Sequence, residues 1–193
     1  MTDFLISFDL SVFRFVNGSL QNAVFDFLMP FLTDLNKNKP VLVVILLALV
    51  VWFFKGGKNA RFAILMLVPT ILLSDQLNSS VIKFIIERPR PCHVLSDVHL
   101  LVSCGSGFSF PSSHAVNNFA GAVVLSFFVP RSAWGWFTFA AVVSFSRVYV
   151  GVHYPSDVVG GAVVGMACGG FIILLFGHVE KFLKSRRLKS GHR

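Results

Sequence analysis

Charged residues and cysteine are both scarce in this sequence. Of its 193 residues only 13% are charged, about half of the 25% found in an ordinary soluble domain, whereas 54% are apolar. This composition excludes a disordered chain and argues against a soluble globular enzyme. The three cysteines are too few for a scaffold of several disulfides or for a four-thiolate zinc site.

The sequence also lacks the cationic start of a signal peptide, because Asp3 and Asp9 stand there. Its net charge is +8, from 17 basic and 9 acidic residues, but the basic residues lie between apolar segments and in the tail over 181–193. Nucleic-acid binding would need these charges on one exposed surface. We therefore expect no nucleic-acid partner and interpret the basic residues as cytoplasmic anchors of a membrane protein.

Long apolar segments are what the sequence has instead. In segment 4–16 polar residues recur every three or four positions, which predicts a helix over 1–18 that lies in the membrane interface. Six candidate spans follow, each long enough to cross with some thinning or snorkelling: 22–33, which Asp26 weakens, then 40–54, 62–86, 115–129, 133–150 and 156–176. The predicted fold is an all-α polytopic membrane bundle of about six transmembrane helices. It forms one domain over 1–193 and ends in a basic cytoplasmic tail over 181–193.

Residues 87–113 interrupt this pattern, because Pro89, Pro91 and Pro111 occur there among several glycines and serines. Six spans put both termini on one face of the membrane. That face carries 11 of the 17 Lys and Arg residues, which predicts that both termini are cytoplasmic. The loop over 87–113 and the turn over 147–156 then share the outer face.

Polar and charged residues gather where spans end on that outer face. They form three clusters: Lys83 with Arg90; Ser112, Ser113 and His114; and Arg147 with His153 and Asp157. Charges near a bilayer are costly unless they are paired or solvated, so their presence there indicates a use. Three cations, two imidazoles, a carboxylate and hydroxyls suit the binding and transfer of a phosphate group.

The spacing of these clusters resembles the three-part signature of the type 2 phosphatidic acid phosphatase (PAP2) superfamily. The matching motifs are Lys83-x6-Arg90-Pro91, Pro111-Ser112-Ser113-His114 and Ser146-Arg147-x5-His153-x3-Asp157; Ser113 stands where many members have glycine. The family comprises membrane lipid phosphatases, related to soluble acid phosphatases and vanadium haloperoxidases. The resemblance implies a metal-independent phosphatase without a cofactor. Haloperoxidase activity is not expected of a chain this short and this apolar.

The resemblance also implies a role for each motif residue. His153 would be the nucleophile that forms a phosphohistidine, and Asp157 would orient its ring. His114 would protonate the departing oxygen and then take a proton from water. The phosphoryl oxygens would be held by Lys83, Arg90 and Arg147 and, at a helix start, by Ser112 and Ser113.

Each of these residues, taken singly, also has a structural interpretation. His153 could be an interfacial residue, Asp157 a helix N-terminal charge after Pro155, and Lys83 and Arg147 snorkelling span ends. The joint spacing favours the catalytic interpretation. Three residues in the loop stay outside the motifs: Arg88 is open between headgroup contact and lipid anchoring, and His93 and His99 are expected on the loop surface.

Two further patterns are expected to be structural. Asp75, Ser79 and Lys83 share one helix face, so Asp75 should face the bundle and help to hold Lys83. Gly161, Gly165 and Gly169 form a stripe of small residues that permits close helix approach. We expect this stripe to pack within the monomer, with dimerisation as the alternative.

We expect an enzyme that hydrolyses a lipid phosphate or pyrophosphate in a bacterial inner membrane, with its active site facing the periplasm. Undecaprenyl diphosphate is the first candidate, followed by phosphatidylglycerophosphate and phosphatidic acid. Two other hypotheses stay open. One is a lipid-to-lipid phosphotransferase. The other is a non-enzymatic lipid-binding or transport protein, which would not need His114, His153 and Asp157 together.

The cysteines divide between the outer loop and a span. Cys92 and Cys104 fall in the loop, and Cys168 falls inside the last span. The outer compartment of a bacterial cell permits disulfides, so we expect a bridge that would keep the first two motifs in register. Two free thiols are the alternative, because sequence does not show that the Cα atoms approach within about 7 Å.

Overall fold

The computed structural model describes residues 2–35 and 37–190, and these residues form helices and connecting loops without a strand. The elements are α1 (Thr2–Arg14), η1 (Phe15–Ser19), α2 (Ala23–Thr33), α3 (Lys39–Lys55), α4 (Gly57–Leu77), η2 (Asn78–Ile82), α5 (Lys83–Ile86), α6 (Pro91–Val94), α7 (Ser113–Phe128), η3 (Pro130–Ser132), α8 (Ala133–Tyr149) and α9 (Pro155–Ser190). The expected all-α class is confirmed.

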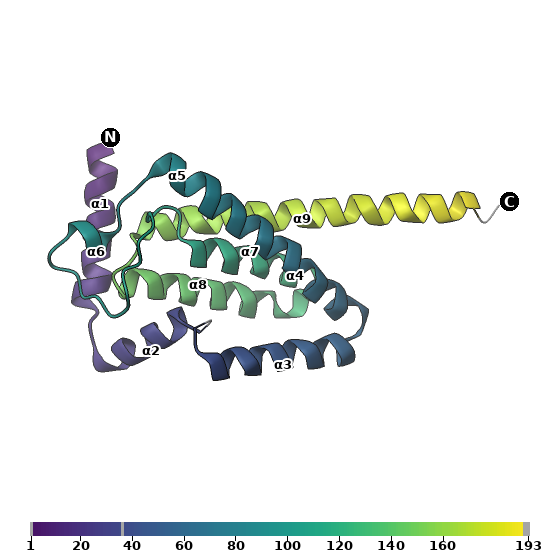
Figure 1. Ribbon diagram of the computed structural model, residues 1–193, viewed down its shortest axis with the longest axis horizontal. Coiled ribbons are helices and arrows are strands. Elements are labelled where there is room, and N and C mark those ends of the chain that lie inside the picture. The colour runs from purple at the N-terminus through teal and green to yellow at the C-terminus, as the bar shows by residue number, and fades with distance from the viewer. Residues whose placement is uncertain (1, 36, 191–193) are drawn as a thin grey trace.

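Helix α7 is the centre of the bundle and packs against α9, α8 and α4 (Figure 1). Its contact with α9 is close because glycines of α9 face it. A Cβ on Gly161 would lie 2.8 Å from the carbonyl oxygen of Ser112, a Cβ on Gly169 would lie 2.8 Å from that of Ala120, and a Cβ on Gly165 would collide with the carbonyl of Val116. The glycine stripe therefore packs within the monomer, as expected.

Five helical segments agree with expected spans. Helices α3, α7, α8 and α9 and the continuous run α4–η2–α5 cover the segments 40–54, 115–129, 133–150, 156–176 and 62–86. Among the described residues, two helical segments are long and apolar enough to cross a membrane by length and composition, Gly57–Val94 and Pro155–Arg186.

Helix α2 lies beside the outer-loop end of α8 and extends over only part of the length of the bundle (Figure 1). At its start, the backbone N–H of Asn22 donates to the hydroxyl of Tyr149 (3.3 Å), and at its end the hydroxyl of Thr33 accepts from Arg147 (2.6 Å). Both partners belong to the last turn of α8, so α2 lies at one end of the bundle. Its 11 residues extend only about 16 Å at 1.5 Å per residue. The expected span over 22–33 is therefore not confirmed.

The two ends of the chain lie at opposite ends of the bundle. Helix α1 lies beside α6 and the start of α9, whereas the far part of α9 extends away from the opposite end (Figure 1). This arrangement (Figure 1) does not confirm the expectation that both termini share one face, which counted 22–33 as a span. The basic segment expected as a tail over 181–193 continues α9 as a helix as far as Ser190, and 191–193 lie outside the described residues.

The outer loop is closed on itself by a disulfide and is bound to the body through Asn17. Cys92 and Cys104 form a disulfide with their Cα atoms 6.1 Å apart. Asn17, 1% exposed, donates to the carbonyls of His99 (2.8 Å) and Tyr149 (2.7 Å) and accepts from the N–H of His99 (2.9 Å). His99 is only partly exposed, with its Nε2 3.0 Å from a carboxylate oxygen of Asp26, which corrects its expected surface position.

The α7–α9 contact yields a first prediction. Gly165→Ala should destabilise the protein by about 1–3 kcal/mol, because the added methyl group overpacks a helix contact that has no space for it. The matched control is Gly170→Ala in the same helix, where an added Cβ meets nothing within 4 Å. Thermal unfolding in detergent should show a lower Tm for Gly165→Ala alone. Equal Tm values for the two variants would refute the close contact.

Candidate active site

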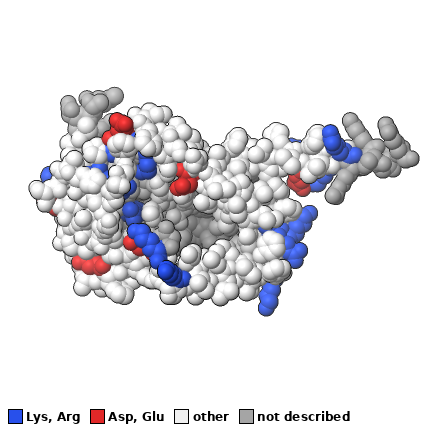
Figure 2. Space-filling model, in the orientation of Figure 1, with Lys and Arg blue, Asp and Glu red and all other residues white. Residues whose placement is uncertain are grey.

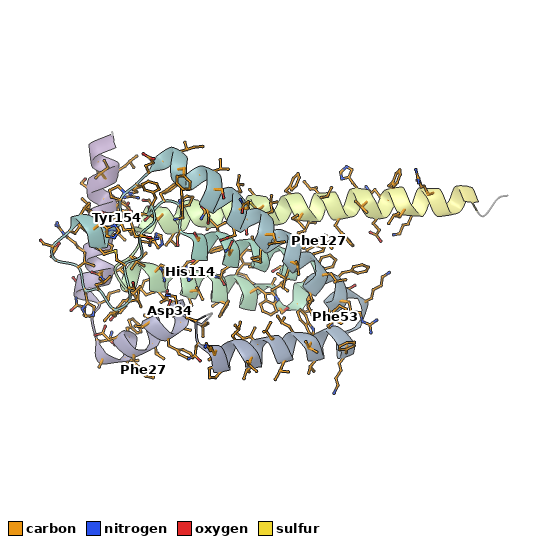
Figure 3. All side chains as sticks on the ribbon, in the orientation of Figure 1. Phe27, Asp34, Phe53, His114, Phe127 and Tyr154 are labelled. Carbon is orange, nitrogen blue, oxygen red and sulfur yellow. A yellow bond between two sulfur atoms is a disulfide. The ribbon has the colours of Figure 1, made fainter. Side chains whose placement is uncertain are left out.

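The predicted motif residues meet at the end of the bundle that carries the outer loop. Figure 3 labels His114, Asp34 and Tyr154 at this end, and Phe53 and Phe127 toward the other. The residues come from the junction of η2 with α5, the loop after α5, the start of α7, the end of α8 and the start of α9. Five of them are almost fully buried: Lys83, Ser112, Arg147, His153 and Asp157.

His153 and Asp157 form a buried pair across the first turn of α9. The Nδ1 atom of His153 lies 3.4 Å from Oδ2 of Asp157, and the two side chains are 3% and 0% exposed. On the other side of the ring, Nε2 of His153 lies 3.3 Å from a guanidinium nitrogen of Arg90. A carboxylate beside Nδ1 favours the tautomer with its proton on Nδ1. Nε2 then carries the free lone pair and faces a cation.

Asp157 is held by four further contacts of different kinds. Because Asp157 is the third residue of α9, its Oδ2 accepts from the backbone N–H of Tyr154 at the N-cap (2.7 Å), one half of a capping box. The same oxygen accepts from the hydroxyl of Ser109, and Oδ1 accepts from Arg88 (2.7 Å). The backbone carbonyl of Asp157 accepts from the N–H of Ser112 at the start of α7 (3.0 Å). These bonds compensate the cost of burying the carboxylate.

The imidazole of His153 is kept neutral by its surroundings. It lies in the turn between α8 and α9, and burial lowers the pKa of His153 well below the usual value of histidine. The positive charges of Arg147 and Arg90 lower the pKa further, while Asp157 acts in the opposite direction. An unprotonated imidazole at neutral pH is the form that attacks an electrophile.

The three motif cations donate only to neutral groups. Lys83 donates to the carbonyl of Phe108 (2.7 Å), Arg90 to that of Gly107 (2.8 Å), and Arg147 to the hydroxyl of Thr33 (2.6 Å). Across the described parts of the chain, none of the three forms a salt bridge. Such a cluster of uncompensated positive charge is suited to an anion.

Two buried donors in this cluster have no partner within residues 2–35 and 37–190. They are the hydroxyl of Ser112 and Nε of Arg147. The N–H groups of the first turn of α7 have no acceptor within the helix either, and such a turn favours an anion. The hydroxyl of Ser113 accepts from Asn78 (2.8 Å), which leaves its O–H and its backbone N–H as donors.

His114, the second residue of α7, lies beside the last residue of α2. Its Nε2 is 3.0 Å from the carbonyl oxygen of Thr33, which leaves Nδ1 free for proton transfer. The ring borders a cavity of about 370 Å³, together with Thr33, Asp75, Asn117 and Val143 among others. Asp75 accepts from Asn117 (3.2 Å) and makes no hydrogen bond to Lys83, so the support expected for Lys83 comes from the loop carbonyl.

Several residues of the site lie outside the three motifs. Arg88, left open between two surface roles, contacts Asp157 instead. Asp9 and Thr33 reach the site from segments far away in the sequence, whereas Ser109 lies two residues before the second motif. No spacing signals these three residues. Cys92, His93 and Cys104 lie close together, but the disulfide removes both thiolates as metal ligands, and His93 is exposed as expected.

Comparison with known proteins gives the same family as the motifs. The family model described as PAP2 superfamily matches residues 62–180. A lipid A 4'-phosphatase of Bacteroides thetaiotaomicron is 30% identical over 188 residues, covering 92% of this chain and 80% of the relative. The undecaprenyl-diphosphatase BcrC of Bacillus subtilis is 31% identical over 159 residues, covering 82% of this chain and 79% of the relative.

Two solved structures are also similar. LpxE of Aquifex aeolicus superposes with a TM-score of 0.63 at 27% identity, over 85% of this chain and 93% of that protein. A transmembrane PAP2-type phosphatidylglycerolphosphate phosphatase from Bacillus subtilis superposes with a TM-score of 0.62 at 26% identity, over 92% of this chain and 87% of that protein.

The depressed pKa of His153 yields a second prediction. Because the folded protein disfavours the imidazolium, His153 should stay neutral from pH 8 down to about pH 5, whereas a free histidine is half protonated near pH 6.5. NMR of protein with ¹³C-labelled histidine rings should show a His153 signal, assigned by its loss in His153→Gln, that does not titrate in this range. A midpoint between pH 6 and 7 would contradict the burial argument.

The cation cluster yields a third prediction. Inorganic phosphate should raise the Tm of the protein, by the equivalent of about 2.7 kcal/mol at a concentration of 100 Kd. Arg147→Met should lose most of this rise without a loss of Tm in phosphate-free buffer, because it removes an uncompensated buried charge. The control is Lys37→Met, since Lys37 is 64% exposed and pairs with Asp34. An equal rise in all three proteins would exclude the cluster as the binding site.

Proposed function

This chain belongs to the PAP2 superfamily, and we propose that it is a membrane phosphatase that hydrolyses a lipid phosphate or diphosphate through a phosphohistidine. One observation carries the proposal: a neutral, carboxylate-supported imidazole faces a cluster of three cations that no carboxylate pairs in the described chain. A nucleophile and a binding site for the phosphoryl oxygens therefore lie side by side. Relatives with the names lipid A 4'-phosphatase and undecaprenyl-diphosphatase support the same chemistry.

The reaction divides into two displacements. In the first, the lone pair on Nε2 of His153 forms a bond to phosphorus while the bond from phosphorus to the lipid oxygen breaks, and His114 gives that oxygen a proton. In the second, water attacks phosphorus, His114 takes a proton from the water, and the bond to His153 breaks. Inorganic phosphate leaves, and both imidazoles return to their initial states.

The protein's main contribution to both steps is electrostatic. Negative charge accumulates on the equatorial phosphoryl oxygens, and Lys83, Arg90 and Arg147 neutralise it. The loop carbonyls of Gly107 and Phe108 fix two of these side chains before the substrate arrives, so little reorganisation is needed during the reaction. The Ser112 hydroxyl and the first turn of α7 add further donors.

The lipid part of the substrate has a place beside His114. The cavity there shares Asn117, Asn118 and Phe139 with a second, more apolar hollow of about 510 Å³ between α3, α4, α7 and α8. Because His114 protonates the leaving oxygen in this mechanism, the leaving group extends from the phosphate site toward these spaces. Their apolar lining supports a lipid in preference to a water-soluble phosphate.

The membrane position follows from the surface of the bundle. In Figure 2 basic side chains gather toward two ends of the molecule, and the hollowed surface between them is largely uncharged. We place α3, α4–α5, α7, α8 and α9 across the bilayer of a bacterial inner membrane. The basic α3–α4 turn and the end of α9 are then cytoplasmic, and the site faces the periplasm.

The N-terminal helices would lie in the outer interface. Phe4, Leu5 and Phe8 of α1 and Phe27 of α2 are more than half exposed, on elements that lie across the site end of the bundle. The helix expected over 1–18 is then interfacial, as in the sequence-based expectation, but it lies on the periplasmic side. The N-terminus is accordingly periplasmic and the C-terminus cytoplasmic.

Phosphate release from a panel of lipids tests the proposal. Purified protein in detergent with EDTA should release phosphate from at least one of undecaprenyl diphosphate, phosphatidylglycerophosphate, phosphatidic acid and lipid A. His153→Ala should lose roughly 10³-fold or more in kcat, and His114→Ala roughly 10²–10⁴-fold. His93→Ala, which changes an exposed histidine of the outer loop, is the control and should keep full activity.

The same assay can contradict the proposal in three ways. Full activity of His153→Ala would exclude the phosphohistidine, and a strict requirement for added magnesium would exclude catalysis by the cationic side chains alone. Transfer of the phosphoryl group to an added acceptor lipid, without free phosphate, would identify a phosphotransferase.

A further inference from the structure

The guanidinium of Arg88 bridges two buried carboxylates from opposite ends of the sequence. Its Nη1 donates to Oδ1 of Asp157 (2.7 Å), and its Nη2 donates to Oδ2 of Asp9 (2.7 Å). The side chains of Asp157 and Asp9 are 0% and 9% exposed, and that of Arg88 is 24% exposed. Ion pairs in such surroundings are little screened by solvent and hold their geometry.

Asp9 connects helix α1 to the first turn of α9. Its carboxylate accepts from the backbone N–H of Ser156 (2.9 Å) and from the Ser156 hydroxyl (2.5 Å). Ser156 is the residue directly before Asp157, and its own hydroxyl accepts from Arg88 (2.6 Å). Helix α1 therefore supplies a cap, from outside the helix, to the turn that carries the catalytic carboxylate.

Arg88 is fixed independently of these two carboxylates. Its guanidinium carbon lies 4.0 Å from the centre of the Tyr154 ring, a cation–π contact. The backbone carbonyl of Arg88 accepts from the N–H of Ser109 (2.7 Å). The hydroxyl of Ser109 in turn donates to Asp157 and lies 3.4 Å from Nδ1 of His153. Arg88 thus supports Asp157 through its side chain and through its backbone.

The contacts of Arg88 separate it from the phosphate-binding cations. Lys83, Arg90 and Arg147 donate to neutral oxygens and keep their charge available, whereas both terminal nitrogens of Arg88 are paired with carboxylates. An arginine engaged in this way is not available to a phosphoryl group. Its position behind Asp157 makes it suited to orienting that carboxylate instead.

We propose that Arg88 and Asp9 are positioning residues that hold Asp157 against His153, and that helix α1 is in this way a part of the active site. The proposal rests on the proposed function of His153 as nucleophile. Without Arg88, Oδ1 of Asp157 loses its charged donor and the carboxylate gains freedom to rotate away from Nδ1. Without the charge of Asp9, Arg88 loses one of the two partners that fix its fork. The outer face of α1 is apolar, so the seating of α1 and the geometry of the catalytic pair are linked.

Steady-state kinetics of single variants tests the roles. Arg88→Ala should lower kcat roughly 10–100-fold with KM changed by less than about threefold, because orientation of the nucleophile is lost while phosphate binding remains. Arg88→Lys should fall between Arg88→Ala and wild type, since one ammonium group cannot bridge both carboxylates. Asp9→Asn should lower kcat roughly 3–10-fold, because Arg88 then holds Asp157, and through it the nucleophile, less firmly.

A matched control and a double-mutant cycle separate positioning from general support of the fold. Asp97→Asn breaks the Arg14–Asp97 pair (3.3 Å), which also joins α1 to the outer loop but lies on the surface, and it should leave kcat within about twofold of wild type. In the Arg88→Ala background, Asp9→Asn should have almost no further effect, because both act through one contact.

The His153 ring signal provides a readout that a merely structural role would not move. Loss of the carboxylate from its place beside Nδ1 should shift the neutral His153 ring away from the tautomer with its proton on Nδ1, and the ring ¹³C shifts in Arg88→Ala should report this change. Asp97→Asn should leave these shifts at the wild-type values. If Arg88→Ala does not fold, the same measurements on Asp9→Asn and Arg88→Lys test the proposal.

Three results would overturn the proposal. They are an increase in KM at unchanged kcat for Arg88→Ala, equal effects of Asp9→Asn and Asp97→Asn, and additive effects of Asp9→Asn and Arg88→Ala. If wild type releases phosphate from no lipid, the proposed function fails, and the ring ¹³C shifts of His153 in the variants still decide whether Arg88 and Asp9 act on this pair.

Discussion

One buried carboxylate organises the active end of this molecule. The side chain of Asp157 has no exposed surface. The free-energy cost of burying an unpaired carboxylate there is larger than the stabilisation from any single contact. Donors from the α8–α9 turn and from two residues of the outer loop, Ser109 and Arg88, offset this cost, and α1 contributes through Asp9. Elements distant in sequence converge on one atom group, and His153 is positioned as part of the same network.

The packing of the bundle serves the same purpose. Helices α7 and α9 carry the two sides of the site, and the glycines of α9 allow their backbones to approach closely enough for Ser112 to bond to the carbonyl of Asp157. The cations follow a different principle, because they are held by neutral carbonyls and hydroxyls and keep their charge. The site thus combines a carboxylate whose hydrogen bonds are all formed, which orients the nucleophile, with cations that have no carboxylate partner and can bind a phosphoryl group.

Much of this arrangement could be predicted from the sequence. Apolar periodicity identified five helical segments that the structure contains, and the three motifs identified residues that come together at one end. The helix expected over 22–33 is present but its role as a span is not confirmed, and the partners of Asp26, Tyr149 and His99, are visible only in three dimensions. Arg88 stayed open for a related reason: its partners lie 79 and 69 positions away, at Asp9 and Asp157, and no local pattern records such contacts.

The central claim is that the phosphoryl group passes through Nε2 of His153, since Nδ1 faces Asp157. The most direct test is to quench the protein with a lipid phosphate substrate during turnover, digest it at alkaline pH, where phosphohistidine survives, and map the modified residue by mass spectrometry. The account predicts phosphate on His153, bonded to Nε2, in wild type and none in His153→Ala. Phosphate on another side chain, or on Nδ1 of His153, would contradict it.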